Sequence, residues 1–389
     1  MANTLTAILP TIYEGLDTVS REFVGFAAGA TRDSGIERAA KGQTITSFIA
    51  PAVTAADITP GVTAPNDGDQ VFGSINLTIS KSRYVPIRWN GEEQRAISPA
   101  NGGVGQNSIL VQQFAQAFRT LVNEAETDMF MAAYKGASRA YGTAGTTPFG
   151  TAGDLSDFAG VNQILDVNGA PIGDRHLVVS SAGMANIRGK QSVLFKVNEA
   201  GTSELLRQGT IGEVQGLALH YSAANTLVTK GTGTGYLTNS AALVKGTTVI
   251  PTDTGTGTIL AGDVVTFAGD TNKYVVTSPL SGGSFTIGAP GLLAAVADNV
   301  AITVGNSYTP SVAFHRSALI VATRAPAVPV DQAGNAMDIA EDRTIVVDPT
   351  SGIAFEVSLY LQYRQIRYEV GLCWGTGVIK SDSLALLLG

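Results

Sequence analysis

The 389-residue sequence has few of the residue types that usually mark a chemical site. Cys373 is its only cysteine, which excludes an internal disulfide and a cysteine-rich zinc site. Its three histidines, His176, His220 and His315, are far apart in the sequence, and none lies in a metal-ligand motif. No stretch approaches the roughly 18 consecutive apolar residues of a membrane-spanning helix. Disulfide-rich, zinc-finger and helical membrane proteins are therefore excluded.

Charge is also scarce. Charged residues make up 15% of the chain, against roughly 25% in typical soluble domains, whereas the hydrophobic fraction is an ordinary 44%. A disordered chain would show the reverse pattern. Because surface charge keeps proteins apart in solution, a free monomer is disfavoured, and we expect much of the surface to be covered. The net charge of −7 also argues against tight, sequence-independent DNA binding.

The beginning of the chain predicts an arm followed by a long hairpin. Apolar residues spaced by three and four predict a short helix over Thr11–Val24, and Gly25–Gly42 has no clear period. Two β-prone segments, Thr44–Ile49 and Ile75–Ser80, are separated by a long Pro-, Gly- and Asp-rich loop. Such a hairpin would project from the body and would need a neighbour to lie on. Glu14 and Asp17 precede the first basic residue, which argues against a signal peptide and favours a soluble protein made inside the cell.

A long helix and a mixed α/β region follow. Asn107 is a good N-cap, the helical pattern covers Ser108 to about Tyr134, and Gly136 ends it. At 1.5 Å per residue this helix would be roughly 40 Å long, which is typical of a structural spine. Further on, the pattern predicts two helices and two strands, in this order: helix Phe158–Asn168, strand Leu177–Val179, helix Ser181–Lys190 and strand Leu217–Tyr221.

Residues 225–309 differ in composition, with only three basic and four acidic residues in 85. Short strand candidates recur at intervals close to ten residues, which predicts a small β-barrel or sandwich. These candidates are Ala241–Val244, Val264–Ala268, Tyr274–Thr277, Phe285–Ile287 and Val300–Val304. Beyond residue 310 the composition again resembles that of the region before 225, with a buried strand over Ala318–Ala322. A final alternating strand begins at Phe355 and changes phase after Tyr363, so we expect a bulge near Arg364.

No motif supports an enzyme. The segment Gly183–Gln191 has the wrong spacing for a phosphate-binding loop, and Gly231–Gly235 lacks the spacing of a dinucleotide fingerprint. His220 is interpreted as a plain histidine on the polar face of a strand. The adjacent acidic pairs Glu92/Glu93 and Glu341/Asp342 would diverge in an extended chain, so they are interpreted as solvated charges. No catalytic residue, cofactor site or metal site is predicted.

Basic and aromatic residues alternate only next to the hairpin, where three basic side chains surround Tyr84 and Trp89. Salt bridges between subunits explain this group at least as well as nucleic-acid binding does. The candidate intersubunit contacts of the hairpin and its adjacent strand are Asp57, Asp67, Asp69, Lys81, Arg83 and Arg88.

This order of elements resembles the major capsid proteins of tailed bacteriophages, and most of all coat proteins of the P22 type, which carry an extra β-barrel. The closest local matches are Leu260–Gly269 in the insertion and Ser311–Pro326 after it, and the opening segment Asn3–Phe23 also fits. The resemblance implies an α+β, HK97-like capsid fold with an arm, a hairpin called the E-loop, a spine helix, peripheral and axial domains, and an inserted barrel.

The resemblance also implies boundaries and partners. The expected parts are 1–42 (arm), 43–95 (E-loop hairpin), 96–140 (spine helix and peripheral domain), 141–225 (first peripheral and axial part), 226–308 (barrel) and 309–389 (second part). The expected role is to build hexamers and pentamers of an icosahedral shell around double-stranded DNA, through a precursor shell that expands on packaging. Expected partners are further copies of the chain, a scaffolding protein, a portal protein and weakly bound DNA, with decoration proteins left open and no membrane. The shell would be assembled in the cytoplasm of a bacterial host and become part of the virion.

Two other interpretations stay open from the sequence. A secreted or surface β-rich adhesion or fibre protein would explain the Gly- and Thr-rich segments, although the long helix disfavours it. An α/β enzyme with a β accessory domain would require converging polar residues, for which the sequence offers no motif.

Overall fold

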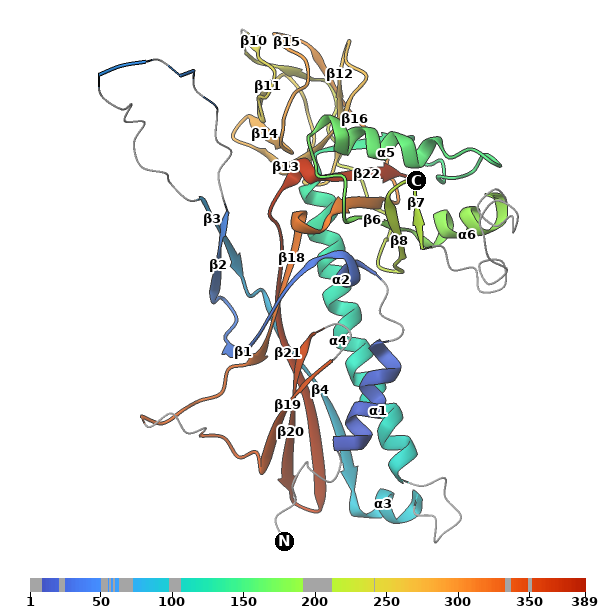
Figure 1. The fold of residues 1–389 in the computed structure, drawn as a ribbon, viewed down its shortest axis with the longest axis vertical. Helices are drawn as coiled ribbons and strands as arrows, with labels where there is room; N and C mark the ends of the chain where they lie inside the picture. The colour runs from blue at the N-terminus through green and yellow to red at the C-terminus, as the bar shows by residue number, and fades with distance from the viewer. Residues whose placement is uncertain are drawn as a thin grey trace.

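The computed structural model describes residues 9–20, 25–49, 55, 57–58, 60–62, 73–97, 106–191, 212–240, 242–332, 337–348 and 352–389. With 24% helix and 41% strand, the fold is mixed α+β, as predicted. The molecule is elongated: a long helix runs along its length, a sheet lies beside the helix, and a barrel and a second sheet occupy one end (Figure 1).

The spine helix is α4, Gln106–Gly136, close to its predicted bounds. Helix α1, Leu9–Ser20, packs along it, and its apolar residues Ile12 and Leu16 are buried there. The predicted first helix extended to Val24, but residues 21–24 lie outside the described residues. Next come a short helix, α2 (Phe26–Gly29), and strand β1 (Thr31–Ala39), neither of which the sequence pattern predicted.

A six-stranded sheet covers one side of the spine helix. Its strand order is β1 (Thr31–Ala39), β18 (Leu319–Pro326), β21 (Gln365–Val378), β20 (Ala354–Gln362), β19 (Asp342–Val347), and β4 (Lys81–Asn90) pairs with β21 as well. Phe355 of β20 and Trp374 of β21 are buried in the same apolar core as Phe114 and Phe118 of α4. Helix α3, Gly91–Ile97, continues directly from β4. The sheet and the spine therefore share one core.

The phase change in the last alternating segment is a hairpin turn, so the prediction of a bulge within one strand is wrong. Strands β20 and β21 pair antiparallel from Glu356↔Gly371 to Gln362↔Gln365, which leaves Tyr363 and Arg364 as the turn. Arg364 has a positive φ of 55°, as tight hairpin turns require. Leu361 pairs with Ile366 across this turn, so both continue the same apolar face. A two-residue turn and a bulge both shift the alternation of apolar and polar residues, so the sequence pattern does not distinguish them.

The second sheet continues from the body into the barrel. Its body part runs β7 (Glu213–Val214), β8 (Leu217–Tyr221), β6 (Arg175–Val179), β17 (Ser311–His315), β22 (Leu384–Leu388) and β5 (Arg139–Gly142). Helices α5 (Ser156–Val167) and α6 (Ser181–Lys190) pack on it through one apolar core. Strand β5 then pairs with β13 of the barrel.

The insertion is a closed six-stranded barrel, as the spacing of its strands predicted. The ring runs β12 (Val264–Phe267), β16 (Ala301–Val304), β9 (Tyr236–Thr238), β11 (Val249–Asp253), β14 (Ser284–Ile287), β13 (Lys273–Ser281), and β12 pairs with β13 to close it. A small ribbon of β10 (Ala242–Leu243) and β15 (Val296–Ala297) accompanies it. The sequence pattern did not predict β11, in which Pro251 interrupts the run.

Candidate assembly surfaces

The hairpin formed by β2 (Thr44–Ile49) and β3 (Gly73–Thr78) projects from the molecule. Figure 1 shows it reaching away from the spine helix, and among the described strands its two strands pair only with each other. At its base, Leu77 and Ile79 pack against Ile320 and Cys373 of the six-stranded sheet. A lone two-stranded ribbon is marginally stable in water, so the rest of the hairpin requires another surface.

Three of the most exposed large apolar side chains of the described chain lie on the hairpin. Phe48 is 77% exposed, Ile58 is 96% exposed and Val62 is fully exposed. Their position on one projecting element makes this element a candidate contact surface for another protein. The hairpin thus combines a projecting shape with uncovered apolar groups.

The predicted contact residues fall into three groups. Asp57 and Arg88 are exposed, whereas Asp67 and Asp69 lie outside the described residues. Arg83 is 58% exposed and approaches Glu124 of α4 at 3.6 Å. The Lys81 ammonium lies 2.8 Å from the carboxylate of Asp128, so its charge is already compensated within its own chain. Lys81 therefore links β4, the strand that follows the hairpin, to the spine helix.

Two buried acids of the spine helix were not predicted as functional, and both join elements that are distant in the sequence. Asp128, 7% exposed, accepts one bond from Lys81 of β4 and one from the indole Nε1 of Trp374 at 2.8 Å. Glu126, also 7% exposed, accepts bonds from the backbone N–H groups of Phe26 and Ala27. The only sequence signal was an acidic residue between the apolar positions Ala125 and Met129.

The structure brings together two histidines that the sequence placed apart. The parallel pairing of β6 and β8 puts Val178 opposite His220, and the imidazole Nδ1 of His176 lies 2.9 Å from Nε2 of His220. His176 Nε2 in turn lies 3.0 Å from Asp174, which pairs with Arg316. His220 lies on the half-buried face of β8, opposite Leu217 and Leu219, and its contact with His176 was not predicted from the sequence. Burial lowers the pKa of His176, so this imidazole favours the neutral form.

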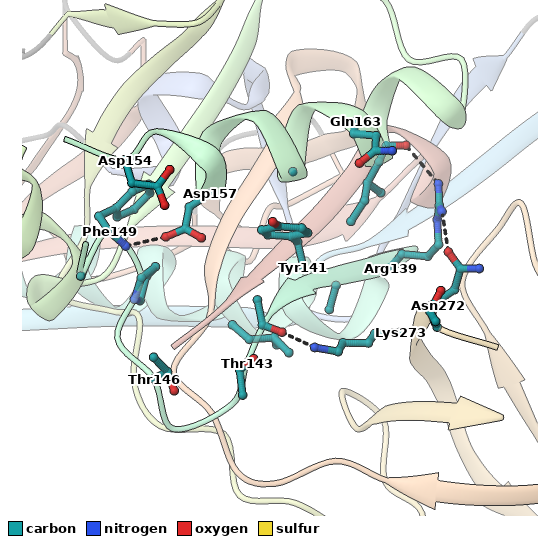
Figure 2. Close-up of a pocket in the computed structure, with 18 of the residues that line it drawn as sticks. Arg139, Tyr141, Thr143, Thr146, Phe149, Asp154, Asp157, Gln163, Asn272 and Lys273 are labelled. Atoms are coloured by element: carbon teal, nitrogen blue, oxygen red, sulfur yellow. Dashed lines mark hydrogen bonds between the residues drawn. The ribbon is translucent and has the colours of Figure 1, made fainter. Parts of the chain in front are cut away.

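A cavity of about 780 Å³ lies between α5, the loop after β5 and the start of β13 (Figure 2). Arg139 donates to Asn168 and to the carbonyl of Ile164, and Lys273 donates to the carbonyl of Gly142. Asp157 accepts from the backbone N–H of Phe149 at 2.6 Å. These charged groups are bonded within the cavity wall, where they hold the loop against the barrel and helix α5.

Metal-ligand clusters and membrane-spanning helices are both absent from the described part of the chain. No group of three or more His, Cys, Asp or Glu side chains among the described residues is arranged to hold a metal ion. No helix within the described ranges is long and apolar enough to cross a membrane.

Comparisons with known proteins gave matches at the level of structure only. No protein-family model and no curated protein matches the chain. Among solved structures, a chain from Mycobacterium phage Che8 is 13% identical over 93% of this chain and 90% of its own, with a TM-score of 0.43. The capsid of the cyanophage P-SCSP1u gives 11% identity over 92% and 86%, with a TM-score of 0.46. The mature capsid of bacteriophage PhiM1 gives 12% identity over 94% and 87%, with a TM-score of 0.44.

Proposed function

We propose that this chain is the major capsid protein of a tailed bacteriophage and that its copies assemble into the hexamers and pentamers of an icosahedral shell. The observation that carries the proposal is the projecting β2–β3 hairpin, whose apolar side chains have no cover within the described part of the chain. We infer that its partner is another molecule. A second copy of the chain supplies a large surface without any further component, and repeated head-to-tail contacts of this kind form rings when the rotation between neighbours closes.

The rest of the architecture supports a shell subunit. The spine helix and the six-stranded sheet share one core and form a stiff, elongated body from which the hairpin reaches outward (Figure 1). The barrel enters between β8 and β17, as the inserted barrel of P22-type coat proteins would. We therefore extend the proposal to an HK97-like subunit of the P22 type, with the hairpin as its E-loop.

The proposed assembly pathway follows that of the resembled family. Copies of the chain, a scaffolding protein and a portal protein form a precursor shell in the cytoplasm of the bacterial host, and the shell expands as double-stranded DNA enters. The candidate contacts Asp57, Asp67, Asp69, Arg83 and Arg88 would pair with the neighbouring copy. Lys81 is left out of this set because it already pairs with Asp128 of its own chain.

Assembly of the purified chain tests the proposal directly. Expressed with and without its scaffold, the chain should elute as particles in the megadalton range and show closed shells by negative-stain microscopy. Discrete trimers would instead favour the fibre or adhesion protein, the second candidate, which the high strand content keeps open. Free monomers under every condition would contradict the capsid proposal.

The role of the hairpin is tested by Phe48→Asp, which places a charge in the proposed contact. We expect a folded chain that forms at least tenfold fewer shells, because an ionised carboxylate would have to be buried against the neighbour. The control is Ile172→Asp, since Ile172 is 80% exposed on the body, outside the hairpin. Circular dichroism checks folding. If Phe48→Asp forms shells in normal yield, the hairpin does not make the proposed contact between copies.

A further inference from the structure

The cavity between α5, the loop after β5 and the start of β13 has its charges separated by sign. Figure 2 shows Arg139 and Lys273 on one side of the cavity and Asp154 and Asp157 on the other, with Tyr141 between them. Within the part of the chain that the structure describes, neither cation makes an ion pair. One end of the cavity therefore carries two positive charges that no bonded carboxylate balances.

Arg139 is the buried member of this pair, and all of its hydrogen bonds go to neutral groups. The residue is only 5% exposed. Its Nη2 donates to the carbonyl of Ile164 at 3.3 Å and to the amide oxygen of Asn168 at 2.8 Å. Its Nη1 reaches the amide oxygen of Asn272 at 3.4 Å, and its Nε has no acceptor among the described residues. Asp270 acts on this guanidinium only through space. A buried cation without a bonded anion favours the binding of one.

Lys273 brings a second cation to the same end of the cavity. The antiparallel pairing of β5 and β13 puts Lys273 opposite Ala140, next to the pair of Arg139 and Tyr274. The ammonium group has three N–H donors, and its one bond among the described residues goes to the carbonyl of Gly142. Because this side chain is only half-buried, its other donors are available to a ligand in the cavity.

The loop that closes the cavity is held in one shape by bonds to its backbone. Phe149 has a φ of 60°, which is uncommon for a bulky residue. Its N–H donates to Asp157, and its ring packs on Phe158 with the centroids 4.4 Å apart. The Gln191 side chain donates to the carbonyls of Phe149 and Thr151. The hydroxyl-bearing residues of this loop that line the cavity are Thr143, Thr146, Thr147 and Thr151. The cavity is therefore preformed and offers neutral donors beside the two cations.

We propose that this cavity binds a ligand through a single carboxylate or phosphate group, which the Lys273 ammonium and the Arg139 guanidinium balance. Asp154 and Asp157 at the other end repel a second anionic group, so a polyanion such as nucleic acid does not fit. The volume of about 780 Å³ lies within the range of small-molecule sites. A free anion and an acidic side chain of a peptide both carry the required group. The site is a property of the single chain and does not depend on the proposed capsid function.

Isothermal titration calorimetry on the full-length, unassembled chain tests the site with two probes. Sodium phosphate represents the free anion, and N-acetyl-aspartate methylamide represents an acidic side chain of a peptide. Both are titrated at constant, low ionic strength in a Tris–chloride buffer. We expect saturable binding of at least one probe at one site per chain, and the probe that binds more tightly identifies the source of the group.

Three variants separate the cavity from a general effect of charge. Lys273→Met removes the cation and should weaken binding at least tenfold, because a hydrogen bond to a charged group is lost. Lys273→Arg keeps the cation and should retain most of the affinity. The matched control is Lys245→Met, since Lys245 is exposed on the barrel outside the cavity. No saturable binding of either probe, or equal affinity in Lys273→Met and Lys245→Met, would overturn the proposal.

If Lys273→Met does not fold, Asp154→Asn decides the question from the other end of the cavity. Asp154 is exposed, and the substituted amide keeps an oxygen that can accept the bond from the N–H of Ser156. The change removes one negative charge from the cavity wall, so binding of the anionic probe should tighten by about threefold at low ionic strength. An unchanged or weaker affinity would contradict an anion site in this cavity.

Discussion

At the scale of single residues, the spine helix is bound to its surroundings through two acids that use different partners. Asp128 is matched by a cation and an indole N–H, whereas Glu126 is matched only by backbone N–H groups. At Glu126 the two N–H bonds favour the ionised carboxylate, whereas burial opposes it and raises the pKa to about 7. Two acids on one helix, two residues apart, thus hold different elements of the fold.

Asp128→Ala should destabilise the chain substantially. It leaves the buried indole N–H of Trp374 without its acceptor and Lys81 without its closest anion, so we expect the free energy of unfolding to fall by about 2 to 4 kcal/mol. Urea unfolding of the unassembled chain measures this. The matched control is Glu124→Ala, because Glu124 also approaches Lys81, at 3.7 Å, but is 36% exposed. That change should cost no more than about 0.5 kcal/mol. Equal losses in both variants would contradict the role of Asp128.

At the scale of elements, glycines within helices show where packing overrides helix propensity. A Cβ on Gly160 of α5 would overlap the ring of Tyr141 on β5, whereas Gly189 of α6 faces open space. Gly160→Ala should therefore lower the free energy of unfolding by about 1 to 2 kcal/mol, since overpacking exceeds the gain in helix propensity. Gly189→Ala should raise it by up to about 1 kcal/mol. Chemical denaturation compares the two, and a stabilised Gly160→Ala would show that α5 does not pack closely on β5.

Elements with a strong period were predictable from sequence, and those whose pattern depends on distant partners were not. The spine helix was predicted to within two residues at each end from its apolar spacing, although Asn107 lies inside the helix and does not cap it, and β2 was predicted with its observed bounds from its β-prone residues. Strand β1 was missed because its polar residues are held by long-range ion pairs, such as Asp33 with Arg324 and Arg38 with Glu356. The β20–β21 turn was misread because a turn and a bulge give the same shift in alternation.

The candidate site was predictable only where it is local. The hairpin could be identified from two strands and the Pro- and Gly-rich loop between them. The links made by Asp128, Glu126 and His176 could not, since each joins residues 44 to 246 positions apart. Sequence spacing within one element says nothing of such pairs. Only the packing of strands and helices brings them into contact.

At the scale of the whole molecule, the barrel is continuous with the body although it is an insertion in the sequence. Strand β13 pairs with β5, with Tyr274 opposite Arg139. Tyr134, near the end of the spine helix, lies against the barrel's Gly262, and Gly288 packs directly on the backbone of Ala137. The two parts therefore share a sheet and a close backbone contact, and we expect them to unfold together.

Calorimetry of the unassembled chain tests this coupling. A continuous sheet should give a single transition whose calorimetric and van't Hoff enthalpies agree, whereas an independent barrel would unfold in a separate step. Gly288→Ala probes the joint, because a Cβ there would collide with the carbonyl oxygen of Ala137, which belongs to rigid backbone. We expect this variant to lower the transition temperature by several degrees or to split the transition in two. Gly173→Ala, at an open position on the body, should leave the transition unchanged. Two transitions in the unaltered chain would show that the barrel is an independent domain.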